Sequence, residues 1–156
     1  MMRIYCGVDP GKKGGYSFIT EDEHGQNVTA HTWDDEGFIR DIRENVAKAE
    51  RHGGNVCAIV EDVHSLPNEG VKSAFSFGKS CGFIEGVLRS NRVPYQLVIP
   101  RKWKKEWSLT NDKKQSIETC KKLFPNLDLR ATERCRTDSD GLAEATLIAE
   151  FGRRHM

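Results

Sequence analysis

Long apolar runs are missing from this chain of 156 residues. No hydrophobic stretch approaches the roughly 20 residues that a membrane-spanning helix needs, and the first residues lack the apolar region of a signal peptide. Repeats and low-complexity tracts are also missing. With 37% hydrophobic and 30% charged residues, the composition is that of an ordinary globular protein. We therefore expect one domain over residues 1–156, with its own core and no membrane partner.

Cysteine and histidine patterns typical of disulfide frameworks or zinc sites are missing too. The five cysteines form no C-x-x-C pair, and the five histidines are scattered without zinc-ligand spacing. Cys6 and Cys57 lie in apolar stretches, where cysteine acts as a small hydrophobic residue. We expect free thiols and a reducing, cytoplasmic compartment.

Net charge is nearly absent, at +1, but the charge is unevenly distributed. Residues 101–122 carry eight basic and three acidic side chains, a net +5, so the rest of the chain carries −4. Such asymmetry indicates an anionic partner, although a lysine run also forms ordinary solvated surfaces. The candidate DNA-binding residues in this stretch are Arg101, Lys102, Lys104, Lys105, Lys113 and Lys114. Trp103 and Trp107, interleaved with them, are expected in the core or in a dimer contact.

Hydrophobic periodicity and turn residues predict the order of the elements. The expected strands cover residues 3–8, 16–19, 27–33, 55–60 and 94–99, and the expected helices cover 37–51, 71–91, 111–124 and 139–152. The first three strands form a meander, and later strands alternate with helices. This order is typical of an α/β domain with a five-stranded mixed sheet and helices on both faces.

Two acids end strands of this sheet. Asp9 ends the first strand just before Pro10 and Gly11, and Glu61 ends the strand over 55–60. If these strands pair side by side, the two carboxylates meet at one edge, where burial of their charge requires a counter-charge or a metal. The alternatives are a turn-capping Asp9 and an ordinary surface Glu61.

Two further acids lie on the last helix. Asp140 and Glu144 are separated by roughly 40° around the helix axis, on the same stripe as Leu147 and Phe151. Acids on a stripe that faces the core favour a bound metal ion, whereas solvated acids in the first helical turns are the alternative. Asp138 is expected as the helix cap or dipole partner, and reaches the site only if the helix begins later.

Four carboxylates from three elements predict an all-oxygen site for Mg²⁺ or Mn²⁺. Such a site can hold two metals about 4 Å apart, which clamp the attacking and leaving oxygens of a phosphoryl displacement. One metal would activate water and the other would stabilise the departing 3′ oxygen, which leaves a 5′-phosphate and a 3′-hydroxyl. No nucleotide cofactor is expected.

Taken together, four motifs resemble the RuvC-like Holliday junction resolvases, especially the small phage-type branch, within the RNase H-like superfamily. They are GVDPGKKGGYSFI at the start, IVEDVH at 59–64, IPRKWKK with a following KLFP, and DGLAEATLIAEF near the end. The resemblance implies an RNase H-like fold, a homodimer and two-metal endonuclease action on four-way DNA junctions. A phage-encoded protein in a bacterial host would fit the expected compartment.

Residue by residue, the resemblance makes Asp9 the metal ligand of the first strand and Glu61 that of the fourth. Glu144 lies where many relatives carry Asp, and Asp140 matches their other acid, at a spacing of four rather than three. Both departures bear on metal preference and rate. Asp140 is favoured over Asp138, which stays open.

The resemblance also places a functional lysine near Lys104, which would contact the scissile phosphate and stabilise developing charge. A second basic position matches Lys113 or Lys114. The loop over 64–70 would overhang the site and could enter a junction centre. The helix over 73–90 is rich in glycine and serine, and we expect it to form the homodimer contact.

Two other functions compete with a nuclease. The chain could be a non-catalytic junction- or nucleic-acid-binding protein whose altered acidic pair no longer holds metal. It could also be a sugar-kinase or actin-like phosphate-binding module, because similar Asp-Gly loops begin those folds. That second alternative is disfavoured, since those proteins need a second, similar domain and this chain is too short.

Overall fold

The computed structural model describes residues 1–64 and 66–156 and contains one five-stranded sheet. The sheet order is β3-β2-β1-β4-β5, with antiparallel pairing from β3 to β1 and parallel pairing from β1 to β5. The strands are β1 (Arg3–Asp9), β2 (Gly15–Asp22), β3 (Gly25–Thr32), β4 (Asn55–Glu61) and β5 (Tyr95–Val98). The predicted mixed sheet, with its antiparallel meander and parallel strands, is confirmed.

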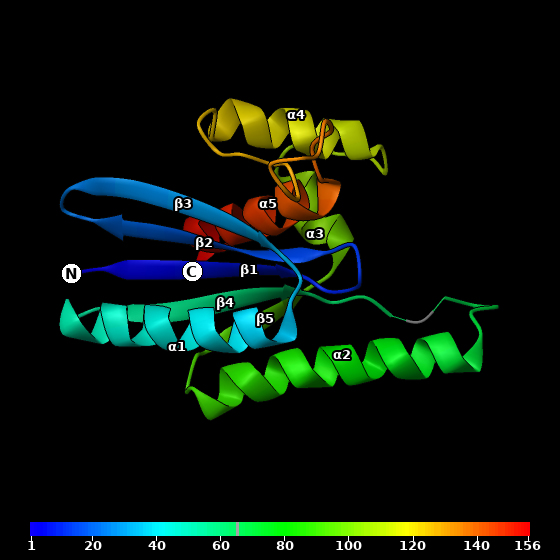
Figure 1. Ribbon diagram of the computed structural model, residues 1–156, viewed down its shortest axis with the longest axis horizontal. Helices are drawn as coiled ribbons and strands as arrows, with labels where there is room; N and C mark the ends of the chain where they lie inside the picture. Colours follow the sequence, from blue (N-terminus) through cyan, green and yellow to red (C-terminus); the bar gives the residue numbers. More distant parts are fainter. Residues whose placement is uncertain (65) are drawn as a thin grey trace.

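Helices cover both faces of this sheet (Figure 1). One face carries α1 (Asp35–Arg51) and α2 (Val71–Ser90), and the other carries α3 (Pro100–Lys105), α4 (Lys113–Leu123) and α5 (Asp140–His155). The helix α5 packs directly on the strands, and α4 lies outside it. The helix α3 was not predicted, because six residues are too few to show a helical period.

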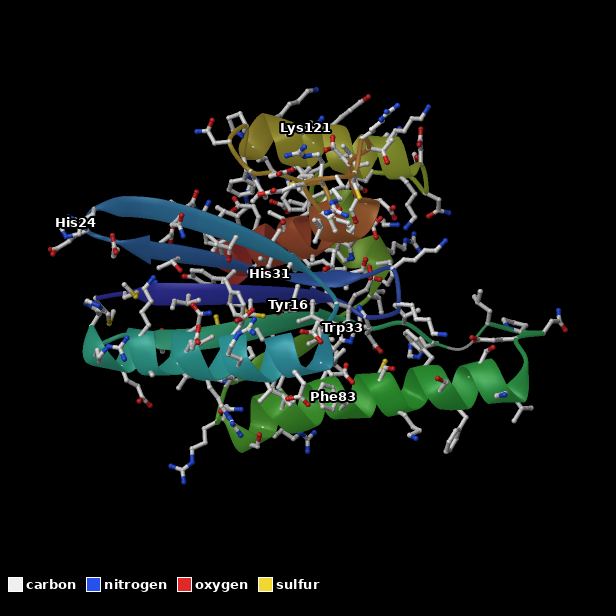
Figure 2. All side chains as sticks on the ribbon, in the orientation of Figure 1. Tyr16, His24, His31, Trp33, Phe83 and Lys121 are labelled. Carbon is white, nitrogen blue, oxygen red and sulfur yellow. The ribbon has the colours of Figure 1, made fainter. Side chains whose placement is uncertain are left out.

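Side chains that point alternately to the two faces of the sheet divide the core into two parts. In β1, Ile4, Cys6 and Val8 belong to the core beneath α1 and α2, so Tyr5 and Asp9 are on the opposite face, towards α5. Aromatic side chains fill the first core, and Figure 2 shows Tyr16 and Trp33 between the sheet and α1. The second core lies between the sheet, α3, α4 and α5.

Two glycines let α5 approach the sheet closely. A Cβ atom at Gly7 in β1 would collide with the backbone of Ala145 and Ala149 on α5. A Cβ atom at Gly141, in the first turn of α5, would collide with the carbonyl oxygen of Lys13 in the turn after β1. The start of α5 is therefore held over the turn where Asp9 ends its strand.

The first half of α2 extends beyond the sheet (Figure 1). Ile84, Val87 and Leu88 in its last turns are buried, but Val71 and Phe75 are 87% and 69% exposed. The first half of the helix therefore presents these two apolar side chains to solvent. Of the predicted loop over 64–70, residue 65 lies outside the described residues.

All five cysteines are free thiols, as their spacing predicted. None of the helices in the part of the chain that the structure describes combines the length and the apolar character needed to cross a membrane.

Candidate active site

Asp9 and Glu61 end neighbouring parallel strands on the same face of the sheet. The strands β1 and β4 pair in register from Arg3 opposite Asn55 to Val8 opposite Val60, which puts Asp9 beside Glu61. In β4, Val60 belongs to the core beneath α1, so alternation turns Glu61 towards α5. Glu61 is 8% exposed. The predicted meeting of these two acids at one edge is therefore present in the structure.

Glu144 reaches the same place from the second turn of α5, where it is only 3% exposed. Its negative charge acts on the carboxyl group of Asp9 at the end of β1. Burial raises the pKa of Asp9 to about 8, and the neighbouring charges of Glu61 and Glu144 add to that rise. Three carboxylates from three elements therefore interact at the end of β1.

Trp103 holds one of these carboxylates in place. The indole is fully buried, and its Nε1 donates a hydrogen bond of 2.7 Å to Oε2 of Glu61. Burial raises the pKa of Glu61, while this hydrogen bond opposes the rise by stabilising the charged form. The sequence indicated a core role for Trp103 but not this contact, because its partner is 42 residues away.

Lys113 lies among the acids, although the sequence grouped it with DNA-binding residues. Its Nζ is 3.2 and 3.3 Å from the two carboxylate oxygens of Glu144 and 3.4 Å from Oδ2 of Asp140. Burial acts to lower the pKa of Lys113, but these carboxylates outweigh it and raise the pKa. Ser116, also on α4, lies 3.5 Å from Glu144 through its Oγ.

The two acids at the start of α5 are in different environments. Asp138 forms an ion pair of 2.5 Å with Lys121 on α4. Ser139 is the cap of α5, and its Oγ accepts a hydrogen bond of 3.3 Å from the amide of Leu142. The expectation that Asp138 caps the helix is therefore wrong, because α5 begins at Asp140. Asp140 contacts Lys113 and is linked through it to Glu144.

The donor set fits a hard divalent cation by its chemistry, since oxygen ligands are those that Mg²⁺ and Mn²⁺ prefer. Burial and the neighbouring acids raise the pKa of Asp9 despite the opposing charge of Lys113, so the negative charge of the cluster is only partly compensated. Among the residues described, no three His, Cys, Asp or Glu side chains are arranged around a common metal position. The acids are therefore assembled, but their side chains do not close around a metal ion.

Basic residues of α3 border a hollow next to this cluster. The hollow has a volume of about 780 Å³, begins at Asp62 after the end of β4, and is lined by Arg101, Lys104 and Lys105. The ammonium of Lys104 lies 5.6 Å from the ring centre of Trp103 and acts electrostatically on Glu61. Lys102 instead lines a separate hollow beside Phe151, so the structure does not bring it to this group.

No protein-family model matches the chain, and no curated protein sequence matches it. The solved structures similar to it include RuvC of Thermus thermophilus in complex with a Holliday junction substrate, with a TM-score of 0.55 and 16% identity. That match covers 99% of this chain and 95% of the other. A second T. thermophilus RuvC structure has a TM-score of 0.52 at 16% identity, and the match covers 99% of this chain and 96% of that one. The fowlpox virus Holliday junction resolvase has a TM-score of 0.51 at 11% identity, with complete coverage of both chains. The fold of this chain is therefore that of the RuvC-like resolvases, as its motifs predicted.

Proposed function

We propose that this chain is a metal-dependent, structure-selective DNA endonuclease. It cuts four-way junctions by phosphodiester hydrolysis and leaves a 5′-phosphate and a 3′-hydroxyl. The observation that carries the proposal is the meeting of Asp9, Glu61 and Glu144 beside a basic hollow. The structural neighbours support it, because two are named as Holliday junction resolvase or as RuvC bound to such a junction.

Asp9, Glu61, Asp140 and Glu144 would hold one or two Mg²⁺ or Mn²⁺ ions. When bound, these ions would supply an activated water and stabilise the leaving oxygen. Trp103 keeps Glu61 oriented through its hydrogen bond, and the close packing of α5 at Gly7 keeps Glu144 over the strand. The protein thus supplies a preorganised cluster of negative charge for the cations, with Glu61 and Glu144 buried.

Lys104 is the proposed catalytic lysine. It projects from α3 into the hollow, close enough to Glu61 to influence its charge. There its ammonium would contact the scissile phosphate and stabilise the charge that develops in the transition state. Arg101 and Lys105 would bind neighbouring phosphates along the same hollow, whereas Lys102 and Lys114 would bind phosphates further from the carboxylates.

Cleavage of synthetic substrates tests the function directly. A four-way junction, a linear duplex and a flap are incubated with the protein, with Mg²⁺ or with EDTA. We expect nicked duplexes from the junction only when Mg²⁺ is present, with ends that DNA ligase can seal. Equal cutting of the linear duplex would overturn junction selectivity, and no cutting of any substrate would overturn the nuclease.

We also propose that the protein acts as a homodimer through the exposed part of α2. Val71 and Phe75 are exposed apolar side chains there, and a Cβ atom at Gly78, Gly82 or Gly86 would meet nothing within 4 Å. A second copy could therefore approach this face closely.

Light scattering at micromolar concentration should give a dimer. Phe75→Glu should shift it to monomer, while the control Arg51→Glu on α1 should not. A monomeric wild-type protein would overturn this proposal.

One observation favours a second function, that of a non-catalytic junction-binding protein. Lys113 already supplies a positive charge to Glu144 and Asp140, so the acids could serve only to anchor α4. Calorimetric titration with Mn²⁺ separates the two functions. Binding that Asp9→Asn removes supports the nuclease, whereas no binding beyond that variant supports the non-catalytic protein.

A further inference from the structure

We infer that Lys113 is a displaceable internal counter-ion, which competes with the divalent cation for Glu144 and Asp140 and leaves them when the cation binds. This inference rests on the proposed metal-dependent function and adds a control of metal loading to it. It is carried by the position of the ammonium, which lies where charge compensation from a metal would otherwise be needed.

The contacts of Lys113 are those of a counter-ion rather than of a surface lysine. Its Nζ contacts both carboxylate oxygens of Glu144, at 3.2 and 3.3 Å, and one oxygen of Asp140, at 3.4 Å. Glu144 is 3% exposed, so an ionised carboxylate there needs a positive partner. The charge of Lys113 also acts favourably on Asp9 and Glu61. The ammonium of Lys113 therefore acts on all four carboxylates.

The ammonium and a metal ion compete for the same carboxylate oxygens. A divalent cation binds carboxylate oxygens at roughly 2.0–2.6 Å, which would bring it close to an ammonium that contacts the same atoms. The two positive charges would repel each other strongly in a buried setting. Metal binding at Glu144 and Asp140 should therefore require that Lys113 withdraws.

The local structure allows that withdrawal at low cost. Lys113 is the first residue of α4, and its side chain is 58% exposed, so the ammonium can turn into solvent without moving the helix. Asp112 caps α4 through the amide of Lys114, independently of the Lys113 side chain. Once released, the ammonium would be free to contact a DNA phosphate, so metal loading and DNA contact would be coupled.

Calorimetric titration with Mn²⁺ in the absence of DNA tests this competition. Lys113→Gln should bind Mn²⁺ about tenfold more tightly than the wild-type protein, within the usual range for coupled ligands. Lys113→Arg keeps the positive charge and should bind like wild type. Lys121→Gln is the matched control, because it removes an α4 lysine paired with Asp138 rather than with the carboxylate cluster.

The outcomes separate this inference from the proposed function. Tighter binding by Lys113→Gln alone supports the counter-ion. Equal or weaker binding by Lys113→Gln, with wild-type binding that Asp9→Asn abolishes, overturns the counter-ion and leaves the nuclease intact. If neither wild type nor Lys113→Gln binds Mn²⁺, the proposed function fails as well.

A second measurement uses the wild-type protein and does not depend on the folding of a variant. Acetylation of each lysine by a water-soluble active ester is followed by peptide mass spectrometry, with Mg²⁺ or with EDTA. Lys113 should react several-fold faster with Mg²⁺, because its amine loses its carboxylate partners, while Lys121 should react at an unchanged rate. A Mg²⁺-independent rate at Lys113, in protein shown by calorimetry to bind metal, would overturn the displacement.

Discussion

Two glutamates on α5, Glu144 and Glu150, are equally buried at 3% exposure but lie in opposite electrostatic settings. Glu150 accepts hydrogen bonds of 2.7 and 2.9 Å from Arg153 and of 2.8 Å from Arg154. These arginines also pair with Glu21 and Glu106. Glu144 instead shares one lysine with Asp140 and lies against two further acids.

The pKa values follow this difference. At Glu150, burial acts to raise the pKa, but the two guanidinium groups outweigh it and the pKa is lowered. At Asp9 and Glu61, burial dominates and the pKa is raised. Balanced charges at one end of α5 thus stabilise the fold, whereas unbalanced charges at the other end resemble the strained electrostatics of functional sites.

The largest effect should come from removing one charge of the unbalanced cluster. Asp9→Asn should lower junction cleavage by about a thousandfold or more, because a metal ligand is lost. Binding of the junction should remain within about twofold, since phosphate contacts dominate affinity. Single-turnover cleavage and gel-shift titration measure the two quantities. Cleavage that survives in the variant would remove Asp9 from the mechanism.

The next largest effect should be on stability, at the balanced end. Glu150→Gln should reduce the free energy of unfolding by about 2–3 kcal/mol, because two partly buried arginines lose their partner. The same change at Glu144 should cost less than about 1 kcal/mol in metal-free protein, since it also relieves repulsion. Urea unfolding of both variants measures the contrast. Equal losses would mean that the two ends of α5 do not differ as proposed.

The pH dependence of the free energy of unfolding should also distinguish the two ends of α5. Because the folded pKa of Asp9 is raised from 3.8 to about 8, its contribution to stability is complete below pH 4 and is lost as the pH rises through 8. Between pH 5 and 9, the free energy of unfolding of metal-free wild-type protein should therefore fall by about 2 kcal/mol relative to that of Asp9→Asn. This is less than the full rise in pKa implies, because solvent screens the half-buried carboxyl. Urea unfolding in EDTA across this range measures the difference.

The lowered pKa of Glu150 makes stability depend on pH in the opposite direction. Its contribution is present above the ordinary value of 4.5 and is lost as the pH falls below it. The stability difference between wild type and Glu150→Gln should therefore shrink in acid. A difference between wild type and Asp9→Asn that stays constant from pH 5 to 9 would contradict the electrostatic contrast.

The smallest effect concerns the basic rim of the hollow. Lys105→Gln should reduce the slope of log K against log salt by about 0.9 for duplex arms, because one phosphate contact is lost. Arg51→Gln, on α1 at the opposite face of the sheet, is the matched control and should leave the slope unchanged. Gel-shift titration of a junction at several salt concentrations gives the slopes. An equal change in both variants would show that DNA binding is not localised to the basic residues of α3 that line the hollow.

Much of the electrostatic contrast between the two ends of α5 could be predicted from the sequence. Strand ends and alternation were sufficient to predict that Asp9 and Glu61 meet, because parallel neighbours bring their ends to one edge. The arginines three and four residues after Glu150 are a signal in the sequence for the paired charges at the other end of α5.

The contacts that complete the candidate site could not be predicted in this way. Trp103 and Lys113 reach Glu61 and Glu144 across 42 and 31 residues, so only the packing of α3 and α4 on α5 brings them there. The exposure of the first half of α2 has the same origin, because periodicity marks an apolar stripe but not whether a strand lies beneath it. These features depend on tertiary placement rather than local pattern.

Anomalous diffraction at the manganese edge, from crystals of the protein soaked in Mn²⁺, would show whether the carboxylate cluster binds a metal ion. We expect an anomalous peak coordinated by oxygens of Asp9, Glu61 and Glu144 at the end of β1, with Lys113 turned away from Glu144. A peak elsewhere, or no peak with Lys113 still on Glu144 and Asp140, would overturn the proposed metal site.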